Sequence, residues 1–215
     1  MPTAEAASSL LSLSGTDDTG AKPALRRQAR TARAAAWATD GAGAALAVCR
    51  TVLDNALVPA GATLGGYWPV GSELDCRPLL HALHEAGCWC ALPVVNAADQ
   101  PLRFRLWRPG DSLAPGRAGC LEPSGTAPEI LPEALLVPLL GFDAAGYRLG
   151  QGGGFYDRTL AAMRGSGDSV LAIGLAFAVQ ELPALPAESH DQRLDWIVTE
   201  AGTRRFPRAL PPDPG

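Results

Sequence analysis

The stretch between residues 146 and 158 carries the residue types that proteins use to bind phosphate. Arg148 and Arg158 lie at its two ends and suit phosphate better than a neutral ligand. Asp157 would repel phosphate unless a cation such as Mg²⁺ lies between them. Four closely spaced glycines let the backbone approach an anion: Gly150, Gly152, Gly153 and Gly154. The stretch therefore predicts a site for a nucleotide phosphate and its metal, with a mobile surface hairpin as the alternative.

The elements around this stretch would present backbone N–H groups to such an anion. Residues 135–140 form an apolar run typical of a buried strand, and residues 156–163 favour a helix. The first turn of a helix carries unpaired N–H groups and the positive end of the helix dipole. Two common nucleotide-binding loops are excluded. No Lys-Ser or Lys-Thr pair follows the glycines, and their spacing does not fit G-x-G-x-x-G.

A basic stripe on a predicted helix is a second candidate for anion binding. Pro23 suits the first turn of this helix, and apolar residues recur along it at helical spacing: Leu25, Ala29, Ala32 and Ala36. A second face is basic: Lys22, Arg26, Arg30 and Arg33. No acidic residue interleaves with this face, which favours an anionic partner, although most such stripes are solvated surface. Asp40 and Gly41 predict a break before another helix over residues 44–57.

The remaining patterns predict an α/β fold with a mainly parallel sheet flanked by helices, because strands alternate with helices. A helix is expected from Ser72, as N-cap, to residue 86, and a polar loop over residues 109–131. Strands are expected at 62–68, 88–95, 102–107, 135–140, 170–177 and, last, 194–199. We expect a single catalytic domain over residues 21–206, a disordered extension over 1–20 and a flexible tail over 207–215.

Composition narrows the class of protein. A net charge of −4 argues against bulk nucleic-acid binding. The five cysteines lack the spacing of a disulfide framework or zinc ribbon, and Cys88 and Cys90 are expected as buried thiols on one face of a strand. His81 and His84 lack a third metal ligand and are expected to be solvated. We expect no membrane partner and a cytoplasmic location, since neither a membrane span nor a signal peptide is evident.

Four motifs occur along the chain in a fixed order. The first is Lys22-x-x-Leu25-Arg26, and the second is Tyr67-Trp68-Pro69-x-x-x-Glu73-Leu74. The third runs from Val137-Pro138-Leu139-Leu140-Gly141-Phe142-Asp143 through Gly146-Tyr147-Arg148-Leu149-Gly150-x-Gly152-x-Gly154-Phe155-Tyr156-Asp157. The fourth is Glu188-x-His190-Asp191 followed by Asp195-x-Ile197-Val198-Thr199-Glu200. Together they resemble the 5-formyltetrahydrofolate cyclo-ligase family, also called 5,10-methenyltetrahydrofolate synthetases, and the third motif is the most specific.

This resemblance implies a fold related to ribose-5-phosphate isomerase and the CoA transferases. It also implies an ATP- and Mg²⁺-dependent cyclisation of 5-formyltetrahydrofolate to 5,10-methenyltetrahydrofolate, with release of ADP and phosphate. The formyl oxygen would attack the γ-phosphate of ATP, and N10 of the folate would capture the activated imidate. A monomer with a small-molecule folate substrate is expected.

The resemblance also implies residue roles. Lys22 and Arg148 are expected to act in catalysis, and Asp157 and Asp191 to bind the metal. Folate contacts are expected from Trp68, Glu73 and Phe155. ATP contacts are expected from Lys22, Arg26, Arg148, Leu149, Gly150, Gln151, Gly152, Gly153, Gly154, Phe155 and Tyr156.

Each of these roles has a structural alternative. Lys22 and Arg26 could be surface charges, Trp68 a core aromatic and Asp191 a turn residue. Arg30 and Arg33 are interpreted as solvated. Three loop residues depart from a common family pattern. Gln151 replaces a common Tyr or Arg, Gly153 stands where some members carry Lys, and Phe155 stands where the family often has Tyr.

Two further functions remain as alternatives. One is a non-catalytic nucleotide- or folate-binding relative. The other is an isomerase or CoA transferase with the same fold, although no motif identifies the glutamate nucleophile that a CoA transferase needs.

Overall fold

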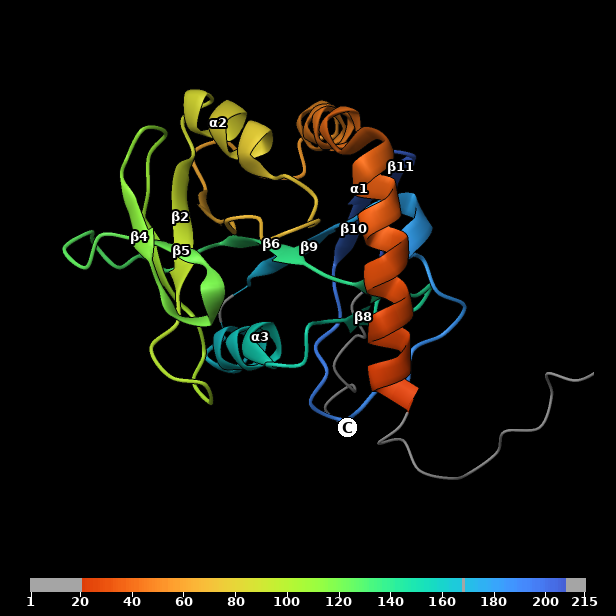
Figure 1. Ribbon diagram of the computed structural model, residues 1–215. Helices are drawn as coiled ribbons and strands as arrows, with labels where there is room; N and C mark the ends of the chain where they lie inside the picture. Colours follow the sequence, from red (N-terminus) through yellow and green to blue (C-terminus); the bar gives the residue numbers. More distant parts are fainter. Residues whose placement is uncertain (1–20, 168, 208–215) are drawn as a thin grey trace, which may run out of the picture.

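The computed structural model describes residues 21–167 and 169–207, which form a seven-stranded sheet flanked by helices (Figure 1). The predicted extension over residues 1–20 lies outside the described residues, as does the predicted tail apart from Pro207. In spatial order the strands are β11 (Gly202–Arg205), β10 (Trp196–Thr199), β9 (Leu171–Leu175), β6 (Ala134–Pro138), β1 (Thr63–Gly65), β2 (Trp89–Val94) and β3 (Arg103–Leu106).

The five inner strands, from β10 to β2, run parallel, and each edge strand pairs antiparallel with its neighbour. Helix α2 (Arg77–Glu85) connects β1 to β2, and α3 (Phe155–Gly165) lies between β6 and β9 in the chain. The predicted α/β fold with a mainly parallel sheet is therefore confirmed. Its relation to ribose-5-phosphate isomerase stays a prediction.

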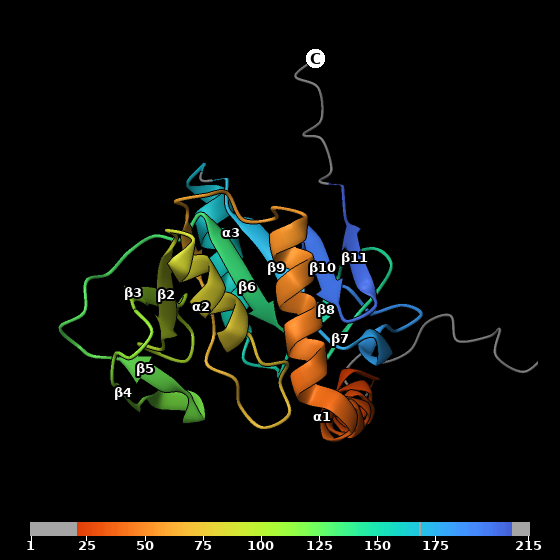
Figure 2. The same ribbon diagram turned by 90° about the horizontal axis from the view of Figure 1, so that it is seen from above.

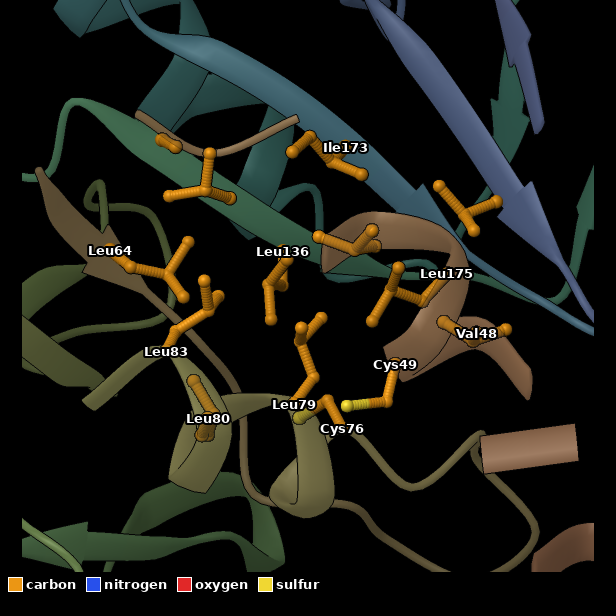
Figure 3. Close-up of a cluster of buried hydrophobic side chains, with 14 of the residues drawn as sticks. Val48, Cys49, Leu64, Cys76, Leu79, Leu80, Leu83, Leu136, Ile173 and Leu175 are labelled. Carbon is orange, nitrogen blue, oxygen red and sulfur yellow. The ribbon is translucent and has the colours of Figure 1, made fainter. Parts of the chain in front are cut away.

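Alternate side chains of the inner strands pack on opposite faces of the sheet. Leu136 belongs to the apolar cluster that includes residues of α1 (Ala21–Asp54) and α2 (Figure 3). Its neighbours Leu135 and Val137 belong to the cluster that includes Leu160 of α3. Seen from above, α1 and α2 lie on one side of β6 and α3 on the other (Figure 2). Because both faces are covered, the inner strands are apolar without alternation.

Helix α1 changes direction at Asp40, whose φ of −157° and ψ of 61° are not helical. This confirms the predicted break. The Asp40 Oδ1 accepts a hydrogen bond from the Gly43 N–H at 2.8 Å and so caps the second half of the helix. The second half covers the sheet beside α2, whereas the first half lies at the carboxyl ends of the strands (Figure 2). The kink therefore places the basic stripe at this edge.

Replacing Asp40 with Ala is expected to lower the free energy of unfolding by about 0.5–2 kcal/mol, because the cap on the second half of α1 is lost. Urea denaturation followed by circular dichroism measures this change. Asp99→Ala, at an exposed loop aspartate, is the matched control and should change stability by less than about 0.5 kcal/mol. Equal stability of the two variants would show that the cap contributes nothing.

Helix α2 begins five residues after Ser72, so the prediction of Ser72 as its N-cap is wrong. The Ser72 hydroxyl instead accepts a hydrogen bond from Arg33 Nε at 3.2 Å. Pro78 lies in the first turn of α2, where a missing N–H has no cost. A buried arginine thus uses the hydroxyl that the sequence pattern assigned to a helix cap.

Several short strands were not predicted from the sequence. The expected loop over 109–131 contains the antiparallel pair β4 (Leu113–Pro115) and β5 (Leu121–Pro123), joined by the 3₁₀ turn η1 (Arg117–Gly119). A hairpin of β7 (Gly141–Phe142) and β8 (Arg148–Leu149) leads into residues 150–154, which we call the glycine loop. The expectation that residues 194–199 are the last strand is also wrong, because β11 follows. Strands of two to four residues are too short to show the alternation of apolar and polar residues by which a strand is predicted from sequence.

The cysteines behave as the sequence predicts. Cys88 and Cys90 are both buried, whereas Trp89 between them is half exposed. His81 is exposed as expected, but the prediction for His84 is wrong, since it is half-buried with Nδ1 out of contact with solvent. No described helix has the length and apolar character needed to cross a membrane.

Candidate active site

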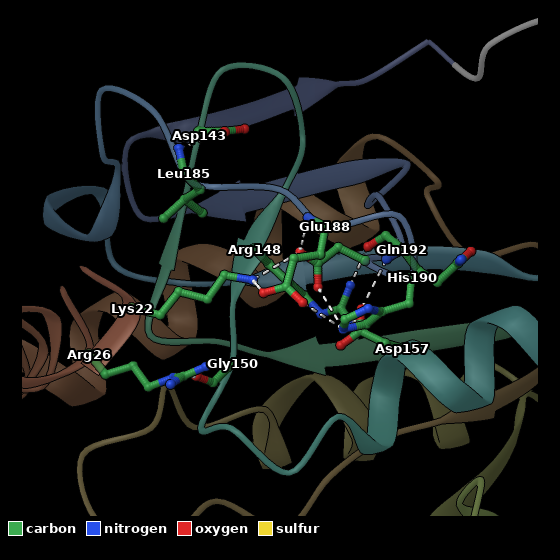
Figure 4. Close-up of polar contacts among 11 residues, drawn as sticks. Lys22, Arg26, Asp143, Arg148, Gly150, Asp157, Leu185, Glu188, His190 and Gln192 are labelled. Atoms are coloured by element: carbon green, nitrogen blue, oxygen red, sulfur yellow. Dashed lines mark hydrogen bonds and ion pairs between the residues drawn. The ribbon is translucent and has the colours of Figure 1, made fainter. Parts of the chain in front are cut away.

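A cleft of about 250 Å³ brings together most of the residues predicted to bind phosphate. Its walls are the first half of α1, the stretch from β8 to the start of α3, and residues 185–192, which we call the segment before β10 (Figure 4). Open parallel sheets bind ligands outside the carboxyl ends of their strands, and the cleft lies at that edge. The predicted site residues that line it are Lys22, Arg26, Arg148, Leu149, Gly150, Gly152, Gly154, Asp157 and Asp191.

The glycine loop adopts a backbone that only glycine tolerates easily. Gly152 has a φ of 108° and Gly154 a φ of 63°. Gly154 is the N-cap of α3 and offers no side-chain cap. The first N–H groups of α3, together with the positive end of its dipole, are therefore available to an anion in the cleft.

Arg26 fixes the loop to helix α1. Its Nε donates a hydrogen bond to the Gly150 carbonyl oxygen at 3.1 Å. One turn earlier on the same helix, Lys22 reaches the same cleft. The two cations of the first motif therefore both line the cleft beside the glycine loop.

Lys22 forms ion pairs with two carboxylates of the segment before β10. Its Nζ contacts Glu188 Oε1 and lies 3.3 Å from Asp191 Oδ2 (Figure 4). Burial lowers the pKa of Lys22, but the hydrogen bonds and charges of Glu188 and Asp191 outweigh it, so the pKa is raised. Lys22 is therefore charged at neutral pH, and it could exchange its ion pair with Glu188 for one with phosphate.

Arg148 is a buried cation of the cleft, with a side chain 4% exposed. It pairs with Asp157 at 2.7 Å and donates to the carbonyl oxygen of Gln192. Asp157 also accepts the Gln192 N–H at 2.9 Å. The pair therefore ties the start of α3 to the segment before β10 and fixes the guanidinium at the cleft wall.

The two aspartates predicted as metal ligands both line the cleft. Within residues 21–167 and 169–207, no three His, Cys, Asp or Glu residues gather to hold a metal ion by themselves. Mg²⁺ needs only one or two carboxylates when phosphate oxygens and waters complete its shell. The carboxylates of Asp157 and Asp191 fit that kind of site.

Glu73, from the second motif, lies against the glycine loop. Its Oε2 accepts the Val70 N–H at 3.0 Å, and its Oε1 lies 3.7 Å from Arg33 NH1. Burial raises the pKa of Glu73 despite the opposing effects of Val70, Arg33 and a hydrogen bond from Gln151. Gln151 also accepts hydrogen bonds from Arg30 at 2.8 and 3.2 Å. The structure thus brings together two motifs that are far apart in the sequence.

The predicted aromatic contacts are divided between two places. Trp68 packs edge-on against Trp107, with ring centroids 5.8 Å apart, and Arg77 lies over it at 5.4 Å. Phe155 and Tyr156 stand in the first turn of α3, partly buried against the core. Of the loop residues, Gln151 and Gly153 are exposed and absent from the cleft wall.

Two arginines, Arg33 and Arg158, differ from their sequence-based interpretation, whereas Arg30 is exposed as expected. Arg33 is 5% exposed, so its assignment as a solvated residue is wrong. Arg30 is exposed but holds Gln151. Arg158 does not line the cleft, because it donates to the carbonyl oxygens of Ala98 and Gly153 at 2.7 Å each. Helical spacing alone could not show which basic residues are buried.

Glu188 and His190 line the cleft but were not selected as site residues. His190 lies 3.5 Å from Glu188 and 3.8 Å from Asp191. Both belong to the fourth motif, and their place in that motif is the sequence feature from which they could have been predicted as site residues. Their sequence context is that of an ordinary turn, and only the fold brings them to Lys22.

Comparison with known proteins gives one consistent result. The model of the 5-formyltetrahydrofolate cyclo-ligase family matches residues 18–200. The 5-formyltetrahydrofolate cyclo-ligase of Escherichia coli K12 is 34% identical over 142 residues, which cover 64% of this chain and 77% of that protein. The Mycolicibacterium smegmatis protein of the same name is 35% identical over 151 residues, which cover 65% and 74%.

The fold gives the same result. The NMR structure of Aquifex aeolicus 5,10-methenyltetrahydrofolate synthetase superimposes with a TM-score of 0.72 at 25% identity and covers 90% of this chain and 97% of that chain. The family match spans all four motifs and the whole of the cleft. This chain belongs to the 5-formyltetrahydrofolate cyclo-ligase family.

Proposed function

We propose that the protein catalyses the ATP-dependent cyclisation of 5-formyltetrahydrofolate to 5,10-methenyltetrahydrofolate, with release of ADP and phosphate. The observation that carries the proposal is the cleft in which Lys22, Arg26 and Arg148 face the uncapped amino end of α3. Three cations and free N–H groups suit a polyphosphate far better than a neutral ligand.

In the proposed reaction the formyl oxygen of the folate attacks the γ-phosphorus of ATP, and ADP leaves. N10 then attacks the activated formyl carbon and loses its proton, and the former formyl oxygen departs with phosphate. Phosphoryl transfer depends on positioning and on neutralising charge, with little covalent chemistry from the protein. Lys22, Arg26 and Arg148 supply positive charge, and the glycine loop supplies N–H groups.

Mg²⁺ would be held by Asp157 and Asp191 together with phosphate oxygens, and it would neutralise negative charge on the phosphates. Arg148 and Lys22 neutralise these carboxylates in the structure. Lys22, whose carboxylate partners are partly exposed, would then be able to exchange them for phosphate, whereas Arg148 stays fixed at the cleft wall by Asp157 and Gln192. This exchange accounts for acidic residues within a phosphate site.

The folate is proposed to lie on the Glu73 side of the glycine loop. A carboxylate accepts hydrogen bonds from the N–H groups of a pterin ring, and an aromatic ring such as that of Phe155 can pack against the pterin. Trp68 already packs on Trp107 and Arg77, which favours its structural role over direct folate contact. Cytoplasmic location and a monomeric state stay predictions.

An absorbance assay tests the proposed function. 5,10-Methenyltetrahydrofolate absorbs in the near ultraviolet, where 5-formyltetrahydrofolate does not. With chelator-treated protein, absorbance should rise only when both ATP and Mg²⁺ are added. Folate and ATP binding without any absorbance change would favour the non-catalytic relative, and turnover without ATP would refute the proposed function.

Replacing Glu73 with Gln is expected to weaken folate binding about ten- to a hundredfold, because a charge-assisted hydrogen bond is lost. Binding of ATP should change less than threefold, since Glu73 does not line the phosphate cleft. Isothermal titration calorimetry with each ligand measures both effects. The control is Glu85→Gln, at an exposed position of α2. Equal losses for folate and ATP would contradict separate roles for Glu73 and the cleft.

A further inference from the structure

We propose that Arg33 is a positioning residue for folate binding, whose buried guanidinium holds the Glu73 carboxylate oriented and ionised. The proposal rests on the proposed function, in which Glu73 contacts the folate. It adds a residue that none of the four motifs contains.

Arg33 is held by contacts with two segments, one of which carries Glu73. Its side chain is 6% exposed. Nε donates to the Ser72 hydroxyl at 3.2 Å, and NH1 donates to the Leu139 carbonyl oxygen at 3.5 Å. Ser72 precedes Glu73 in the chain, and Leu139 directly follows β6. The guanidinium is therefore bonded to the residue that precedes Glu73 and lies 3.7 Å from the Glu73 carboxylate.

The charge of Arg33 is compensated by Glu73. Among the residues that the structure describes, no other carboxylate lies within 4.0 Å of Arg33, and no other cation within 4.0 Å of Glu73. Burial lowers the pKa of Arg33, whereas Glu73 raises it. A buried pair contributes little to net stability, because desolvation offsets the attraction. A role in holding Glu73 explains why the chain carries a charge there.

The other groups around Glu73 do not replace Arg33. Burial raises the pKa of four neighbours, which stay neutral at pH 7: Tyr67, Cys76, Cys120 and Tyr156. Asp75 is negative and pairs with Arg77 at 2.7 Å. Gln151 contributes a neutral amide. In the described part of the chain, Arg33 is thus the cation that opposes the burial of Glu73.

The spacing of the basic stripe places both functions on one helix. Arg33 follows Lys22 by eleven residues, which is about 16 Å along an α-helix. Lys22 and Arg26 reach the phosphate cleft, Arg30 holds Gln151, and Arg33 lies beside Glu73. The first half of α1 thus extends from the proposed phosphate cleft to Glu73, the proposed folate contact.

The test compares Arg33→Met, which removes the charge, with Arg33→Lys, which keeps it. The pKa of Glu73 is measured by ¹³C NMR of labelled carboxyl groups, with Glu73→Gln to assign the signal. We expect a higher pKa for Glu73 in Arg33→Met and partial recovery in Arg33→Lys. Arg50→Met, at an exposed position on the second half of α1, is the control and should leave it unchanged.

Folate binding gives the second readout. In Arg33→Met the Kd for 5-formyltetrahydrofolate at pH 7 should rise about tenfold or more, with the Kd for ATP within twofold. Affinity for folate should fall as the pH drops through the pKa of Glu73, and this fall should move to higher pH in the variant. In the Glu73→Gln background, removal of the Arg33 charge should have no further effect on folate binding.

An unchanged pKa of Glu73 in Arg33→Met would overturn the proposal, as would an equal loss of folate affinity in the Glu73→Gln background. If Arg33→Met does not fold, Arg33→Lys provides the same comparison. We expect it to raise the folate Kd about threefold, and this rise should disappear in the Glu73→Gln background. A wild-type protein that shows no turnover would refute the proposed function, whereas the titration of Glu73 would still decide the role of Arg33.

Discussion

Replacing Arg148 with Met is expected to lower kcat/KM for ATP roughly a thousandfold, because a single well-placed arginine contributes this much to phosphoryl transfer. The Arg148 side chain is buried in the cleft and is held by Asp157 and the Gln192 carbonyl oxygen. Its guanidinium is therefore already fixed and needs little reorganisation when charge develops on the phosphate. Steady-state kinetics with varied ATP measures the loss.

The same substitution has a separate effect on stability. Asp157 keeps the Gln192 N–H but loses its cation, which should cost about 1.5–3 kcal/mol and lower Tm by several degrees. Arg148→Lys keeps one charge but cannot form both contacts, so it should recover stability better than activity. Arg108→Met, at an exposed position, controls for loss of charge. Full activity of the Arg148→Met variant would show that Arg148 has no role in the reaction.

Replacing Lys22 or Arg26 with Ala is expected to lower kcat/KM for ATP about ten- to a hundredfold. Each variant loses one charged contact of roughly 1.5–3 kcal/mol in a partly desolvated cleft. Thermal stability should change little for Lys22→Ala, because its partners Glu188 and Asp191 are partly exposed and can be solvated.

Arg27→Ala is the matched control for this pair of variants. Arg27 is exposed on the same turn of α1 and does not line the cleft. Its substitution should leave kcat/KM within about twofold, since solvated surface changes cost less than about 0.5 kcal/mol. If all three variants were equally active, the phosphate site would depend on the glycine loop and Arg148 alone.

The sequence predicted the parts of the site that depend on local chemistry. Glycines followed by a helix start can be recognised without knowing the fold, because the backbone geometry that they permit is local. Apolar runs such as residues 135–140 identify inner strands of a covered parallel sheet for the same reason. The resemblance to the cyclo-ligase family then added the positions that are expected to contact substrate.

The parts that sequence reasoning missed depend on contacts between distant segments. Arg33 and Arg30 share a helical face with Lys22, yet only the fold shows that Arg33 is buried against Glu73. Glu188 is an ordinary turn residue until the segment before β10 meets α1. The start of α2 was misplaced because Ser72 bonds to Arg33 instead of capping the helix.

If the cleft transfers the γ-phosphate of ATP to the formyl oxygen of the folate, that oxygen must leave in inorganic phosphate. Turnover of 5-formyltetrahydrofolate labelled with ¹⁸O in the formyl group tests this transfer most directly, with mass spectrometry of the released phosphate. We expect the label in inorganic phosphate, one atom for each 5,10-methenyltetrahydrofolate formed. Unlabelled phosphate, with the ¹⁸O recovered in water, would contradict it.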